Sequence, residues 1–175
     1  SEVTVDGDTV FSAIPDSGMF QNPLYQYTAT EGLNVSDGAT ATDWTEQLAG
    51  VGDATAVGGP TYRSDQSGFV AVEYDGNDDG HDIPTDSQLP TGTDPVSFAA
   101  TIYMKGPSGS VIGYGSGSTG NGIVLYFNSS NEIELNIWGK SSPRGGSPST
   151  GQWITVGGAA SQNDQEVYLN GSSVG

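Results

Sequence analysis

The residues best suited to chemistry lie in one short segment, where a single isoleucine separates Glu132 from Glu134. Alternate side chains of a β-strand point to the same face, so both carboxylates would lie on one side of a sheet. Paired carboxylates hydrolyse glycosides, one as general acid and the other as nucleophile or base. Asn136 and Trp138 occupy the next positions on this face, so no third carboxylate follows. We interpret the pair as a solvated acidic face and predict no catalytic residue and no enzymatic activity.

The same face could bind a sugar, because it combines an aromatic ring with hydrogen-bonding groups. Trp138 would supply the ring, and a tyrosine could join it from a neighbouring strand. An aromatic residue at such a position can equally pack under a loop or against a partner subunit. The candidate carbohydrate-binding residues are Trp138, Glu132, Glu134, Asn136, Tyr103 and Tyr126.

An oxygen-rich segment between residues 75 and 82 is the candidate metal site. Carboxylate and amide oxygens are the ligands that Ca²⁺ prefers, but the segment lacks the regular spacing and the closing glutamate of an EF-hand. A purely structural turn is the alternative. The candidate ligands are Asp75, Asn77, Asp78, Asp79 and Asp82, with Asp78 and Asp79 first among them.

His81 is the only histidine, so a catalytic triad or a multi-histidine metal site would have to include it. Its position between Gly80 and Asp82 predicts a loop residue without a catalytic role. Asn-X-Ser sequons occur at Asn34, Asn128 and Asn170, a number close to what chance would supply in a chain so rich in serine and threonine.

The charge of the chain is strongly unbalanced: 21 acidic residues and 4 basic ones give a formal net charge of -17. Such a surface repels itself in dilute buffer, whereas at 1 M salt the Debye length falls to about 3 Å. We therefore expect a halophilic protein, with an ordinary acidic mesophilic domain as the alternative. The charge also excludes direct nucleic-acid binding, because no basic stripe is available to displace counterions from phosphate.

Cysteine is absent, which excludes disulfides and thiolate metal sites. No stretch approaches the roughly 20 apolar residues that span a bilayer. The start at Ser1 is consistent with removal of an initiator methionine and equally with a cleaved signal peptide.

Short alternating segments separated by turn residues predict an all-β protein without a helix. Phe98, Ala100, Ile102 and Met104 should share one face of a strand, and a core strand should follow at 123–127. Further strands are expected at 110–114, 153–156 and 166–169, and at 133–137 with Ile133, Leu135 and Ile137 facing the core. Residues 1–24 predict an irregular arm or a single hairpin.

Three blocks of sequence resemble the LamG-like branch of the concanavalin A-like lectins and glucanases. They are residues 69–84 (FVAVEYDGNDDGHDIP), 95–105 (PVSFAATIYMK) and 151–175 (GQWITVGGAASQNDQEVYLNGSSVG). The resemblance implies a jelly-roll sandwich of two antiparallel sheets over residues 25–175, which could continue in a longer protein, with residues 1–24 as a docking arm. It also implies calcium at a sandwich edge in some members. Retaining glycosidases of this fold carry Glu-x-Asp-x-(x)-Glu, which Glu132 and Glu134 match only at the start.

From this resemblance and the charge we expect a structural or adhesion module on the virion surface of a halophilic archaeal virus, such as a tail fibre, turret or spike. Its arm would contact other virion proteins, and its sandwich a host glycan or surface protein. A homo-oligomer is also compatible with this role. The runner-up is an extracellular haloarchaeal cell-surface domain that binds carbohydrate or protein, and a glycoside hydrolase comes third.

Overall fold

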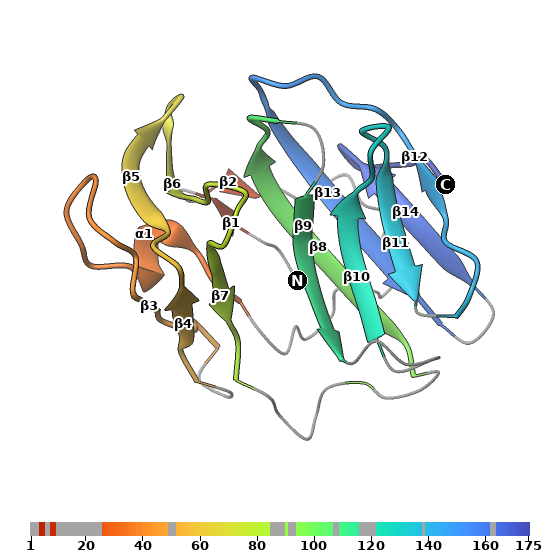
Figure 1. The fold of residues 1–175 in the computed structure, drawn as a ribbon, viewed down its shortest axis with the longest axis horizontal. Helices are drawn as coiled ribbons and strands as arrows, with labels where there is room; N and C mark the ends of the chain where they lie inside the picture. The colour runs from red at the N-terminus through yellow and green to blue at the C-terminus, as the bar shows by residue number, and fades with distance from the viewer. Residues whose placement is uncertain are drawn as a thin grey trace. The chain divides into compact units, whose positions relative to one another are not determined.

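The computed structural model describes residues 4–5, 8–9, 26–48, 52–84, 90, 94–106, 109–115, 122–137, 139–161 and 164–175. These residues form antiparallel β-strands, so the predicted all-β class is confirmed (Figure 1). One single-turn helix, α1 (Ala29–Gly32), corrects the expectation of no helix. The chain divides into two compact units. The first unit is Ser1–Thr9 with Asn22–Leu89, and the second unit is Val10–Gln21 with Pro90–Gly175.

One sheet of the second unit consists, in spatial order, of β12 (Arg144–Gly145), β11 (Ile133–Ile137), β10 (Gly122–Phe127) and β9 (Gly109–Gly115). We call it the β9–β12 sheet. Its register places Leu125 opposite both Leu135 and Ile112. The register shifts in β9, so that Val111 is an extra residue without a partner in β10. Such a bulge bends its strand locally.

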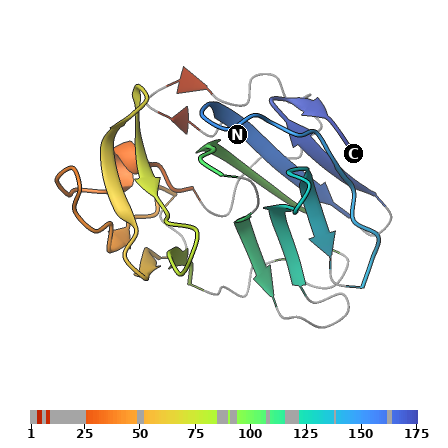
Figure 2. The same cartoon turned by 45° about the horizontal axis from the view of Figure 1, so that its top comes forward.

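The other sheet of the second unit consists of β15 (Ser172–Ser173), β14 (Gln165–Leu169), β13 (Trp153–Ala160) and β8 (Val96–Tyr103). β13 pairs with β8 along its whole length. The two sheets form separate layers in both views (Figure 1, Figure 2).

The core of the second unit lies between these two sheets, because both contribute their apolar faces to one cluster. Alternation along each strand selects the inward residues. Ile133, Leu135 and Ile137 are buried as predicted. Phe98 and Met104 are buried, and Ala100 and Ile102 pack against the cluster, so the predicted inward face of β8 is also confirmed.

The first unit has shorter strands. β3 (Asp43–Trp44), β4 (Ala54–Val57) and β7 (Gly80–Asp82) form one sheet, and β5 (Thr61–Gln66) pairs with β6 (Phe69–Glu73) in a hairpin. The hairpin turn is Ser67-Gly68, and both residues have positive φ, 54° and 95°, as tight hairpin turns require. Across the hairpin, Arg63 Nε lies 2.5 Å from Glu73 Oε2.

Of the predicted arm at residues 1–24, the structure describes β1 (Thr4–Val5) and β2 (Asp8–Thr9), which pair as a hairpin. The remainder of the arm lies outside the described residues. The jelly-roll topology and the single sandwich over residues 25–175 stay predictions.

Candidate functional site

The carboxylate of Glu134 lies in a hydrogen-bond network on the outer face of the β9–β12 sheet. Its neighbours in β11 point into the core, so Glu134 points the opposite way. The register puts Tyr126 of β10 and Arg144 of β12 directly opposite it on either side. Asn128 Nδ2 donates to Glu134 Oε2 at 3.1 Å, and the side chains of Tyr126 and Ser142 also hydrogen-bond to this carboxylate. Glu134 is only 7% exposed as a result.

These contacts keep Glu134 ionised. Burial raises the pKa of the carboxyl, but hydrogen bonds from Tyr126, Asn128 and Ser142 and the charge of Arg144 outweigh it, so the pKa lies below its ordinary value. In turn, burial and the hydrogen bond to Glu134 raise the pKa of Tyr126. A general acid must hold a proton near neutral pH, which requires a raised pKa. The surroundings of Glu134 therefore suit a structural hydrogen-bond acceptor.

Asn128 connects Glu134 to Glu132, and sequence reasoning assigned it no such role. Its Nδ2 also donates to Glu132 Oε2 at 3.2 Å, and its Oδ1 accepts the backbone N–H groups of Ser130 and Glu132. The amide thus uses two donors and two acceptor positions. The available signal was an asparagine at the start of a turn between two strands, where such side chains commonly bond the local backbone.

The structure separates the six candidate carbohydrate-binding residues. Asn136 shares the outer face of the β9–β12 sheet, opposite Val124. Tyr103 instead belongs to β8 in the other sheet, where it lies opposite Trp153 of β13. The two rings pack edge-to-face, with their centroids 5.6 Å apart. Trp138 lies outside the described residues. The structure therefore groups only Glu132, Glu134, Asn136 and Tyr126, and sugar binding stays a prediction.

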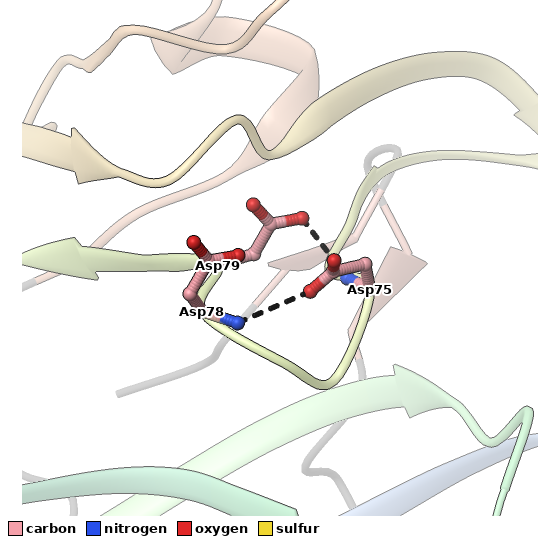
Figure 3. Close-up of side chains that lie close together, drawn as sticks. All are labelled: Asp75, Asp78 and Asp79. Carbon is pink, nitrogen blue, oxygen red and sulfur yellow. Dashed lines mark hydrogen bonds between the residues drawn. The ribbon is translucent and has the colours of Figure 1, made fainter.

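The acidic segment between β6 and β7 brings three of its candidate ligands together (Figure 3). One carboxylate oxygen from each of Asp75, Asp78 and Asp79 lies within 4.8 Å of the others. Asp79 accepts the backbone N–H of Gly59 at 2.6 Å through Oδ1 and that of Asp75 at 3.0 Å through Oδ2. Asp75 Oδ1 accepts the N–H groups of Asn77 and Asp78. These contacts close the turn through its own carboxylates.

Asp78 differs from the other two aspartates, because no hydrogen bond among the described residues uses its carboxylate. Asp82 is not part of the group and lies in β7 opposite Thr55, whereas Asn77 lies in the same turn and donates its backbone N–H to Asp75. Three hard oxygen donors at this spacing could contribute to a Ca²⁺ site. Hydrogen bonds to Asp75 and Asp79 also account for the shape of the turn, and calcium stays a prediction.

His81 lies in β7, which corrects the prediction of a loop residue. Its Nε2 is 2.8 Å from the carbonyl oxygen of Ala41, which can only accept, so Nε2 carries the proton. Nδ1 then accepts the hydroxyl of Tyr74 at 3.0 Å. The His81 ring also packs edge-to-face on Trp44, with the ring centroids 5.5 Å apart. Trp44 packs edge-to-face on Tyr27, with the ring centroids 5.9 Å apart. Both ring nitrogens therefore serve the packing of the first unit.

The pKa of His81 is lowered, and burial of the ring is the largest cause. The hydrogen bond to Ala41 and the charge of Asp43 raise this pKa but do not outweigh the burial. Burial and the charge of Asp79 raise the pKa of Tyr74. His81 is therefore neutral and Tyr74 is protonated at neutral pH.

Within the described part of the chain, no helix is long and apolar enough to cross a membrane. Comparison of the chain with models of protein families, with curated proteins and with solved structures finds no match.

Proposed function

We propose that this chain is a non-enzymatic structural and adhesion module that works in concentrated salt, on the virion surface of a halophilic archaeal virus. In this proposal the chain has the jelly-roll topology of the concanavalin A-like domains that its sequence resembles. The observation that carries the non-enzymatic part is the hydrogen-bonded burial of Glu134. The observation that carries the halophilic part is the net charge of -17.

A glycosidase is the enzyme that the carboxylate pair suggests, and the geometry around it favours a structural role. Glu132 and Glu134 both accept hydrogen bonds from Asn128 Nδ2, and the pKa of Glu134 is lowered. A retaining mechanism needs one of its two carboxyls protonated to assist the leaving group. Hydrolysis of a polysaccharide that Glu134→Gln abolishes would refute the non-enzymatic proposal.

Host recognition in this proposal rests on weak contacts multiplied by copy number. Tyr126 and Asn136 lie half-buried on the outer face of the β9–β12 sheet and offer an aromatic ring and an amide to a sugar. One such shallow contact binds weakly, but many copies on one particle raise the avidity without any new contact.

The origin of the protein is tested by fractionating a native high-salt culture on a density gradient and measuring the intact mass of the protein in each fraction. The proposal expects the chain to co-purify with particles. Recovery from cell envelopes would contradict it and favour the haloarchaeal cell-surface module instead.

The salt requirement is tested by near-ultraviolet circular dichroism during dialysis from molar KCl to about 0.1 M, where the Debye length grows to about 10 Å. We expect the folded signal to disappear, because unscreened carboxylates repel one another in the compact state. An unchanged signal would remove the halophilic part of the proposal.

A further inference from the structure

The two units of this chain carry very different charges. Of the 21 acidic residues, 15 belong to the first unit and 6 to the second, whereas the first unit holds one of the four basic residues and the second holds three. The formal charge is therefore -14 for the first unit and -3 for the second. Repulsion within a compact body grows with the square of its net charge, so without screening it is about twenty times stronger in the first unit.

The buried apolar side chains are divided the opposite way. Among the described residues of the first unit, the buried apolar side chains are those of Leu33, Ala41, Ala54 and Pro60. The core cluster of the second unit contains twelve buried side chains, most of them large aliphatic or aromatic ones. Burial of apolar surface is the main favourable contribution to folding and offsets the entropy lost by the chain. The described core of the first unit is therefore the smaller one, although this unit has the larger repulsion to overcome.

Carboxylates of the first unit also hold its loops, so their charges are part of the fold. Asp37 Oδ1 accepts the backbone N–H of Ser64 at 2.8 Å, and Glu46 Oε1 accepts those of Gln26 and Leu48. The other carboxylates that accept backbone N–H groups in this unit are Asp53, Asp65, Asp75 and Asp79. An ionised acceptor makes a stronger hydrogen bond than a neutral one. The folded unit therefore favours ionised carboxylates, and their mutual repulsion has to be weakened by dissolved salt.

The turn between β6 and β7 shows the distance over which this screening must act. Asp75, Asp78 and Asp79 bring carboxylate oxygens within 4.8 Å of one another (Figure 3). The single basic residue of the unit, Arg63, pairs with Glu73. At 1 M salt the Debye length of about 3 Å is shorter than the separation within the turn, whereas at 0.1 M it is about 10 Å and exceeds it. Dilution therefore restores the repulsion between these carboxylates.

We infer that the fold contains a salt-dependent conformational switch, in which the first unit unfolds at a higher salt concentration than the second as the ionic strength falls. The larger charge and the smaller described core of the first unit both act in this direction. Over an intermediate range of salt concentration, the first unit is unfolded and the second is still folded. This inference rests on the proposed halophilic function and names the part of the chain in which the salt requirement lies.

Hydrogen–deuterium exchange with peptide-level mass spectrometry measures the two units separately in the full chain. The chain is equilibrated at KCl concentrations that decrease from molar to about 0.1 M, with EDTA present so that divalent cations do not contribute. Backbone amides of β5, β6 and β7 report on the first unit, and those of β8, β10 and β13 on the second. We expect the first unit to lose its protection at a KCl concentration roughly twofold or more above that of the second unit.

A charge variant and a matched control separate screening from other effects of dilution. Glu31, Asp78 and Asp82 are exposed, and their carboxylates make no hydrogen bond among the described residues. Glu31→Gln combined with Asp78→Asn and Asp82→Asn changes the charge of the first unit from -14 to -11, which lowers its repulsion by about 40%. This variant should lose first-unit protection at a lower KCl concentration than the wild type. Glu31→Asp combined with Asp78→Glu and Asp82→Glu keeps the charge and should leave the transition unchanged.

Protection in molar KCl shows that each variant is folded before dilution. Loss of protection in both units at one KCl concentration, or first in the second unit, would overturn the inference and leave the halophilic proposal standing. An unchanged first-unit transition in the neutralised variant, or an equal shift in the charge-conserving control, would also overturn it. Protection of both units that persists down to about 0.1 M KCl would instead refute the proposed halophilic function.

Discussion

The contact between Gly158 of β13 and Leu135 of β11 allows a quantitative test of how the two sheets of the second unit pack. A Cβ atom at Gly158 would lie 2.9 Å from Leu135 Cδ1 and 3.1 Å from Leu125 Cδ1. Gly158→Ala therefore overpacks the core and should cost about 1–3 kcal/mol. Leu135 is fully buried, and Leu135→Ala should cost about 2.7–5 kcal/mol through lost burial and a cavity.

The double variant should be less destabilised than the sum of the two single variants. Removing Leu135 relieves the closest contact of the new methyl group, although the contact with Leu125 at 3.1 Å remains. The methyl group also fills part of the cavity, at about 0.8 kcal/mol per buried carbon. Together these effects predict a coupling energy of about 2 kcal/mol between the two positions.

The assay is urea unfolding in molar KCl, followed by tryptophan fluorescence, for the wild type, both single variants and the double variant. Gly106→Ala is the matched control, since nothing lies within 4 Å of a Cβ at that position, and it should change stability by no more than about 0.5 kcal/mol. Additivity of the two single costs within about 0.5 kcal/mol would refute direct packing of these sheets at Gly158.

Three further outcomes follow from the described contacts. The only histidine, His81, has a lowered pKa in the folded state, so the folded state gains stability from its neutrality above pH 6.5 and loses it as pH falls. The Hε1 resonance of the His81 imidazole should titrate with a midpoint below pH 6.5, and a midpoint above pH 6.5 would contradict this prediction. Glu134→Gln should cost about 1–3 kcal/mol in urea unfolding, because the donors of Tyr126 and Asn128 lose a charged acceptor, and an unchanged midpoint would contradict the network. Calcium should raise the Tm of the wild type but not that of Asp78→Asn. Asp78 is chosen because its carboxylate makes no hydrogen bond among the described residues. Equal shifts of Tm in both proteins would exclude this metal site.

The sequence alone determined the features that depend on local alternation. The period of two along 133–137 predicted which residues of β11 enter the core, because a strand has only two faces. The inward face of β8 and the all-β class followed from the same pattern. The net charge is likewise a property of composition and needs no fold.

Long-range pairing decided the rest, because alternation assigns a residue to a face but not to a neighbour. The register put Tyr126 and Arg144 beside Glu134 and so turned a carboxylate predicted to be solvated into a buried one. Tyr103 lies in the other sheet, next to Trp153 and not on the outer face of the β9–β12 sheet. The sequence predicts the strands of Tyr103 and Trp153 but not the sheet to which they belong. These partners are distant in sequence, and only the tertiary structure sets which strands exchange hydrogen bonds and therefore which side chains meet.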